Sequence, residues 1–253
     1  MKIAPEIAEM LLREAERINS TEFIAADPVQ FPRRYAAQAD VEIVALLASH
    51  MAWGNRKMIC RDVERLLDVM GPEPSRWVRD GAFEEIPDGQ NIHRTFFGRN
   101  LKHFLRGLER IYAQYPTLDA FAATLGLRGR ECAPWILAEA LNARMAEANG
   151  CSDSRCLPLN LQSTALKRLN MALRWLVRRD GIVDLGLWSS LTPADLYIPL
   201  DVHVGDTARA IGLTSRKAND RRTTVEITSA LRTLRPDDPA LFDYALFGLG
   251  LNL

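Results

Sequence analysis

Two residues of the sequence are of types that could do covalent chemistry together. Lys167 lies in a stretch of helical periodicity, and Asp201 stands further along, where a short helix is expected to begin. A lysine that has lost its proton can act as a nucleophile and form a Schiff base with a carbonyl carbon, whereas an arginine stays protonated. A carboxylate at a helix start can stabilise positive charge that develops on a reacting group. The plainer interpretation of Asp201 is an N-cap that accepts a backbone N–H.

The stretch Ser163–Arg179 is expected to form the helix that positions the lysine. Its apolar residues recur at helical spacing and predict a buried stripe: Leu166, Leu169, Leu173, Leu176 and Val177. A second face follows at spacings of three or four and carries Lys167, Asn170, Arg174 and Arg178. The three cations on this face have no acidic partner in the same helix. The face is either a solvated surface or a surface that binds phosphates.

Apolar residues recur at helical spacing along nearly the whole chain, and runs with strand alternation are missing. The sequence therefore predicts an all-α fold. A first helix carries Ile7–Ile18, Asp40 caps a second, and Asn55 starts a third that ends at Gly71. Loops are expected at Pro72–Ile92 and Gly150–Gln162. Further helices are expected at Leu101–Gln114, Thr117–Leu125, Glu131–Asn149, Ser163–Arg179, Val202–Ile211, Thr223–Thr233 and Pro239–Leu249. We expect one helical domain over residues 1–253, with two lobes that meet near residues 150–162.

Composition narrows the class of protein. The chain has 32 basic and 32 acidic residues, which argues against a strongly basic coat protein but leaves room for a local basic face. No apolar run approaches the roughly 20 residues that a membrane span needs, and Met1–Asn19 lacks the apolar core of a secretory signal. We therefore expect a cytoplasmic protein with no membrane partner. The spacing of the cysteines fits neither a zinc site nor an iron–sulfur cluster, so no metal or other cofactor is expected: Cys60, Cys132, Cys151 and Cys156.

Several segments resemble the helix-hairpin-helix (HhH-GPD) DNA glycosylases. Leu200–Val204, followed by Thr207–Leu213, resembles the aspartate-containing helix of that superfamily. Lys167–Trp175 resembles the lysine-bearing helix of its archaeal 8-oxoguanine glycosylase branch, in which the stretch between lysine and aspartate is similarly long. Leu46–Leu67 resembles the early helix–turn–helix, and Asp243–Gly250 falls at the closing helix. The whole chain also resembles a bacterial family of unknown function.

The hairpin itself departs from the superfamily pattern. The usual sequence is Leu-Pro-Gly-x-Gly, whose glycines let backbone N–H groups approach a DNA phosphate. Leu157 and Pro158 are present, but no glycine occurs between Gly150 and Gly181. Ser163 could supply N–H and hydroxyl groups in place of the glycines, as could Thr164.

The resemblance implies a role for each candidate residue. Lys167 would be the nucleophile at the sugar C1′, and Asp201 would stabilise the positive charge on the sugar and help to deprotonate the lysine. The early loop would fill the gap left by the extruded base, with Asn55 as the plug and Trp53 as a stacking residue, although a half-buried packing role is the plainer interpretation of Trp53. The DNA-binding residues are expected to be Trp53, Asn55, Arg56, Ser163, Thr164, Arg168, Arg174 and His203.

The leading hypothesis is therefore a base-excision DNA glycosylase with associated AP-lyase activity, for which an oxidised purine such as 8-oxoguanine is a natural substrate. Its partner would be double-stranded DNA with a damaged base, and the protein is expected to be a monomer. One alternative is a damaged-DNA-binding protein on the same scaffold that has lost catalysis, which the altered hairpin favours. Another is a helical protein–protein adaptor. A metal site at Asp201, His203 and Asp206 is disfavoured, because these three side chains point in different directions around a helix and no second His/Asp cluster completes a coordination shell.

Overall fold

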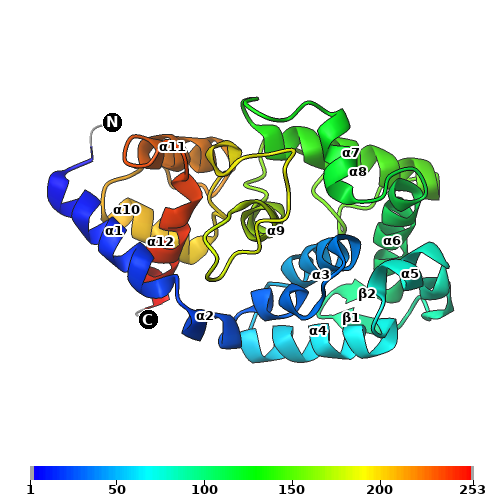
Figure 1. Cartoon of the computed structure of the whole chain (residues 1–253). Helices are drawn as coiled ribbons and strands as arrows, with labels where there is room; N and C mark the ends of the chain where they lie inside the picture. Colours follow the sequence, from blue (N-terminus) through cyan, green and yellow to red (C-terminus); the bar gives the residue numbers. More distant parts are fainter. Residues whose placement is uncertain (1–2, 252–253) are drawn as a thin grey trace. The chain divides into compact units, whose positions relative to one another are not determined.

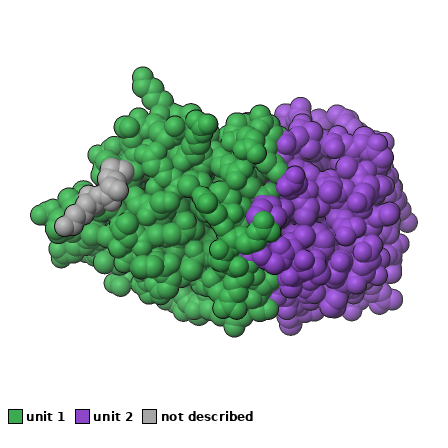
Figure 2. All heavy atoms as spheres, turned by 90° about the horizontal axis from the view of Figure 1, so that it is seen from above, with its two compact units in different colours: residues 1–25, 128–135, 160–253 green, residues 26–127, 136–159 purple. Residues whose placement is uncertain are grey.

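The computed structural model describes residues 3–251 and is mostly helical, as the sequence predicts. Figure 1 shows the helices and one small pair of antiparallel strands, β1 and β2. Contacts between residues divide the chain into two compact units, which Figure 2 colours separately. Unit 1 comprises residues 1–25, 128–135 and 160–253, and unit 2 comprises residues 26–127 and 136–159. One division of the chain thus falls at residues 159–160, within the expected Gly150–Gln162 loop.

Unit 2 is built around α3, and every residue of this helix after Gln38 is buried. Helices that are apolar on all sides belong in a core, and the sequence of α3 is of this kind. The helical elements of unit 2 are η1 (Pro28–Gln30), η2 (Pro32–Arg34), α3 (Gln38–His50), α4 (Arg56–Met70), α5 (Pro74–Arg79), η3 (Ala82–Glu85), α6 (Gly98–Tyr112) and α7 (Leu118–Thr124). The strands β1 (Asn91–His93) and β2 (Phe96–Phe97) form a hairpin between η3 and α6.

Two buried acids of α3 hold the starts of other helices in unit 2. Asp40 was predicted to cap its own helix, but α3 begins at Gln38 and the Asp40 carboxylate instead accepts the Ser75 N–H at 2.7 Å, in the first turn of α5. Glu42 accepts the backbone N–H groups of Leu118 and Asp119 at 2.6 and 3.0 Å, at the start of α7. These acids satisfy N–H groups that a helix leaves unpaired at its N-terminus.

Unit 1 contains α1 and the C-terminal helices. Its helical elements are α1 (Pro5–Ile18), α9 (Lys167–Val177), η4 (Pro193–Asp195), α10 (Val202–Ala210), α11 (Arg221–Arg232), η5 (Pro239–Leu241) and α12 (Phe242–Leu251). α12 packs against both α1 and α10. A Cβ atom on Gly248 would lie 2.8 Å from Ile18 of α1, and one on Gly250 would lie 2.9 Å from Thr207 of α10. The two glycines therefore allow the three helices to approach closely.

Two helices cross the divisions between the units. α2 (Thr21–Ala26) lies at the end of the first segment of unit 1, and α8 (Ala133–Asn149) runs from the segment 128–135 into residues of unit 2. Among residues 3–251, no helix has both the length and the apolar character that crossing a bilayer would require.

The predicted elements differ from the structure at two further places. The expected loop Pro72–Ile92 contains α5, η3 and the start of β1, because short helices of six and four residues leave little periodicity to detect. The expected helix Ser163–Arg179 begins only at Lys167 and ends at Val177. The helix begins four residues later than expected because Leu166 has a left-handed backbone conformation that a helix cannot contain.

Candidate functional site

Lys167 and Asp201 are brought together in unit 1. The Lys167 Nζ atom lies 3.7 Å from Asp201 Oδ2, with 29% and 23% of the two side chains exposed. This distance is within the range of an ion pair but too long for a direct hydrogen bond. Lys167 is the first residue of α9, and Asp201 directly precedes α10. The pair is thus half-buried, reachable from solvent, and held at the starts of two helices.

Hydrogen bonds hold both the side chain and the backbone carbonyl of Asp201 in place. Oδ1 accepts the Val204 N–H at 3.0 Å, which makes Asp201 the N-cap of α10 as predicted. The Asp201 carbonyl accepts a hydrogen bond from the side-chain amide of Asn219 at 3.0 Å. Because Oδ1 serves the cap, Oδ2 is the oxygen that faces the lysine. The Asp201 side chain therefore caps α10 with one oxygen and lies close to Lys167 with the other.

The turn before Lys167 has a conformation that usually requires glycine. Leu166 has φ 50°, and its side chain is buried. Thr164 braces this turn, since its hydroxyl accepts the Leu166 N–H at 3.3 Å and its carbonyl accepts the indole N–H of Trp135 at 2.9 Å. The chain therefore adopts a left-handed residue next to the lysine without the glycines of the usual hairpin.

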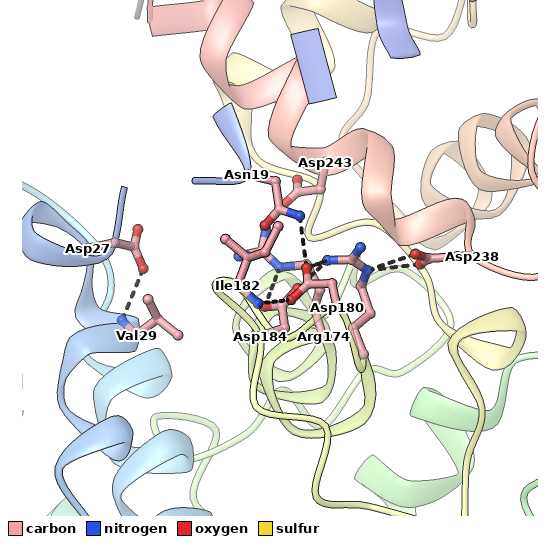
Figure 3. A network of polar contacts seen from close by, with 10 residues as sticks. Asn19, Asp27, Val29, Arg174, Asp180, Ile182, Asp184, Asp238 and Asp243 are labelled. Carbon is pink, nitrogen blue, oxygen red and sulfur yellow. Dashed lines mark hydrogen bonds and ion pairs between the residues drawn. The ribbon is translucent and has the colours of Figure 1, made fainter. Parts of the chain in front are cut away.

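The polar face of α9 is buried, not solvated. Arg174 is 3% exposed and forms ion pairs with Asp243 of α12 and with Asp184 at 3.4 Å (Figure 3). Its guanidinium also lies over the Tyr244 ring, 4.1 Å from the centroid. The expectation that Arg174 would hold a DNA phosphate is therefore corrected. In this conformation its guanidinium is enclosed by protein groups.

Arg178 extends the same buried cluster. It forms ion pairs with Asp184, with Asp180 at 2.8 Å and with Asp238 at 2.9 Å, and only 2% of the residue is exposed. We call the six residues of this network the arginine–aspartate cluster: Arg174, Arg178, Asp180, Asp184, Asp238 and Asp243. Burial of these charges is tolerable because each guanidinium has at least two carboxylate partners. The interpretation of this face as a surface is thus wrong for Asn170, Arg174 and Arg178, whereas Lys167 at the start of α9 is half-buried and reachable from solvent.

Asp243 connects this cluster to the candidate pair. Burial raises the pKa of Asp243, the charge of Arg174 lowers it, and the charge of Asp201 raises it again, so that it reaches about 6. Lys167 also acts on this pKa, in the lowering direction. Asp243 was missed by the sequence analysis, although a single carboxylate among the apolar residues of α12 is a signal that could have identified it.

The remaining candidates of unit 1 lie at or near the surface. Ser163 is exposed and Thr164 half-buried, and both precede the helix start that they were expected to form. Arg168 is half-buried in the first turn of α9. His203 is exposed in the first turn of α10. No group of three or more His, Cys, Asp or Glu side chains gathers as a metal site among residues 3–251.

Three candidates belong to unit 2 and surround the start of α4. Asn55 is the N-cap of α4, and its side-chain oxygen accepts the N–H groups of Lys57 and Met58 at 3.0 and 3.3 Å. Trp53 is half-buried, with its ring 4.5 Å from that of His93 in an edge-on arrangement. Arg56 is half-buried as the first residue of α4. The side-chain oxygen of Asn55 is thus engaged in the cap of α4, and the ring of Trp53 packs against His93.

Comparison with known proteins places the chain in a family. Residues 27–252 match the family model described as "Protein of unknown function (DUF2400)", and the chain belongs to this family. Neither a curated protein nor a solved structure shows significant similarity to it. The function of the chain is therefore inferred from the geometry of its candidate site.

Proposed function

We propose that the chain is a base-excision DNA glycosylase with AP-lyase activity, in which Lys167 is the nucleophile and Asp201 its carboxylate partner. The observation that carries this proposal is the 3.7 Å separation of Lys167 Nζ and Asp201 Oδ2 in a half-buried position. Lys167 is the first residue of α9 and Asp201 is the N-cap of α10, so the pair joins two different helices.

Lys167 and Asp201 have different tasks in the proposed removal of the base. The base must first be extruded from the duplex, because its glycosidic bond cannot be reached within the stack. The amine lone pair of Lys167 then attacks C1′ as the C1′–N bond to the base breaks, and the bonding electrons leave with the base, which takes up a proton. Asp201 stabilises the positive charge on the sugar and receives the proton that the amine loses.

The second half of the reaction follows from the covalent bond. When the sugar ring opens, the Nζ–C1′ bond becomes a Schiff base, which acidifies the proton on C2′. Loss of that proton expels the 3′ phosphate and cuts the strand. An oxidised purine such as 8-oxoguanine is the substrate class that we propose, and double-stranded DNA is the partner.

The decisive experiment traps the Schiff base. The full chain would be incubated with duplexes that carry 8-oxoguanine, an abasic site, uracil or a normal base, and borohydride would then be added. We expect a covalent protein–DNA band with the 8-oxoguanine duplex and with the abasic duplex. The band should vanish in Lys167→Gln, whereas Lys102→Gln is the control for loss of a lysine elsewhere.

Three outcomes would contradict parts of this proposal. A band with the abasic duplex alone would limit the activity to lyase chemistry and leave the oxidised purine unsupported. DNA binding without any band would favour the damaged-DNA-binding alternative, in which catalysis has been lost. A folded protein that does not bind duplex DNA even at low salt would exclude both the glycosylase and the damaged-DNA-binding protein. The protein–protein adaptor would then be the remaining hypothesis.

A further inference from the structure

The β1–β2 hairpin of unit 2 carries an arginine in an unfavourable backbone conformation at its tip. Arg94 and Thr95 form the turn between the paired residues His93 and Phe96, and Arg94 has φ 50°. Residues other than glycine avoid this region, and where they are held in it the position often has a binding role. The Arg94 side chain is exposed.

His93 fixes the hairpin to the turn that precedes α4. Its Nε2 atom lies 2.9 Å from the Trp53 carbonyl, and its Nδ1 atom lies 2.8 Å from Asp62 Oδ2. Burial raises the pKa of Asp62, but hydrogen bonds from His93 and Arg61 outweigh it, and the net direction is downward. The two ring nitrogens of His93 therefore link the hairpin to the residue before Gly54 and to α4.

The result of this bracing is a close contact between Arg94 and Gly54. A Cβ atom on Gly54 would lie 2.3 Å from Arg94 Nη1 and 3.3 Å from its Cδ. Gly54 itself has φ 104°, which side chains rarely adopt. A left-handed arginine in one turn therefore lies against a glycine that leaves room for it in the other turn, and the Arg94 guanidinium lies beside the Trp53–Asn55 turn.

Two further exposed cations contact or follow these two turns. Arg155 is exposed, and its guanidinium donates to the Thr95 carbonyl at 3.1 Å. Lys57, in the first turn of α4, is also exposed. Asp62, the acid beneath this region, is 2% exposed and is already engaged by His93 and Arg61. We call Gly54, Lys57, Arg94, Thr95 and Arg155 the hairpin-tip surface.

We infer that the hairpin-tip surface binds the phosphate backbone of DNA, and that Arg94 is the contact which the two turns are built to present. A guanidinium matches a phosphate in charge and in hydrogen-bond geometry. This inference rests on the proposed function for the identity of its ligand, but it concerns residues of unit 2 that take no part in the chemistry. It adds a strand-positioning contact that the sequence analysis did not identify.

The test measures binding of the full chain to a fluorescein-labelled duplex that contains a tetrahydrofuran abasic analogue, by anisotropy at several KCl concentrations. Each phosphate contact contributes about 0.9 to the slope of log Kd against log salt, which corresponds to about eightfold in Kd at 0.1 M salt. We expect Arg94→Gln to lower this slope by about 0.9 and to raise Kd at 0.1 M salt by about eightfold. Arg94→Lys should keep most of the slope. Arg94→Gly should behave like Arg94→Gln, and glycine suits φ 50°.

Arg76→Gln is the matched control. Arg76 is an exposed arginine of the same unit, paired with Glu73 and Asp80, so its loss changes the net charge equally. An Arg94→Gln variant with the Kd and slope of the wild type would overturn the inference, and so would an equal loss in Arg76→Gln. If the wild type still forms the borohydride band in either case, the proposed function stands. A wild type that fails to bind DNA would overturn both.

Discussion

Arg174 of α9 and Asp243 of α12 form a buried ion pair that lies close enough to the candidate site for Lys167 and Asp201 both to influence the pKa of Asp243. The helix α9, which begins at Lys167, is thereby tied to α12 about two turns further along. This ion pair gives the half-exposed Lys167–Asp201 pair a rigid support on its buried side. Because the pKa of Asp243 is raised, the stability of the folded protein should depend on pH through this residue.

Replacement of Asp243 by Asn should change how stability depends on pH. The raised pKa of Asp243, about 6 against an ordinary 3.8, means that the folded protein keeps a proton which the unfolded chain has released. The resulting stabilisation is complete below pH 3.8 and is lost as the pH rises to 6. It amounts to about 3 kcal/mol. Urea unfolding of wild type and Asp243→Asn between these pH values should show their free-energy difference falling by this amount, and a constant difference would contradict it.

Asp201 offers a way to separate charge from capping. Asn is as good an N-cap as Asp, so Asp201→Asn should leave the free energy of unfolding nearly unchanged, whereas Asp201→Ala should cost about 1 kcal/mol. Both variants lose the carboxylate and should slow single-turnover base release by roughly 10²-fold to 10³-fold. Rates from gel-resolved cleavage and stabilities from urea unfolding would be compared. Full activity in Asp201→Asn would limit this residue to capping.

Glu42 should be among the most important acids for the stability of unit 2. It is fully buried and accepts hydrogen bonds from the Tyr112 hydroxyl and from two backbone N–H groups at the start of α7. Glu42→Ala leaves these donors unsatisfied, each at about 1–3 kcal/mol, so a total loss of about 3 kcal/mol or more is expected. Urea unfolding would measure it against Glu131→Ala, an exposed control that should stay within about 0.5 kcal/mol of wild type. Equal effects would show that Glu42 has no special role.

The His93–Asp62 contact should be strongly coupled. His93 is fully buried and Asp62 is 2% exposed, whereas the Arg34–Glu64 ion pair at 2.6 Å has more than two fifths of each side chain exposed. Double-mutant cycles by urea unfolding should give a coupling energy of about 2–3 kcal/mol for the buried pair. The exposed pair should give about 0.2–1 kcal/mol, because water screens it and two side chains must be ordered. Similar values for both would contradict the bracing role of His93.

Much of the helical framework could be predicted from the sequence, because periodicity and caps are local signals. Asn55 and Asp201 both cap the helices that they were expected to start, and the predicted buried stripe of α9 is buried throughout. The proximity of Lys167 and Asp201 was expected only from the resemblance to a known superfamily. No periodicity relates residues on two different helices.

The burial of Arg174 and Arg178 could not be predicted, because their carboxylate partners lie outside the helix and two of them, Asp238 and Asp243, are distant in sequence. The carboxylates that enclose Arg174 and Arg178 come from the segment after α9 and from the region of α12, up to 69 residues away. Asp40 likewise serves α5, 35 residues further along, and not its own helix. The left-handed backbone conformation of Leu166 could not be predicted either, since leucine rarely adopts it. Such positions are set by tertiary contacts, which override local preference.

The division of the chain into units has a consequence for its biosynthesis. Unit 2 ends at residue 159, so all of its residues have been translated before α9 and the helices after it. α1 is translated before unit 2, yet its packing partner α12 comprises residues 242–251. The apolar face of the amphipathic α1 therefore stays without this partner until residues 242–251 have been translated, whereas unit 2 is complete earlier and can fold in the meantime. During this interval the uncovered face of α1 is a site at which nascent chains can aggregate.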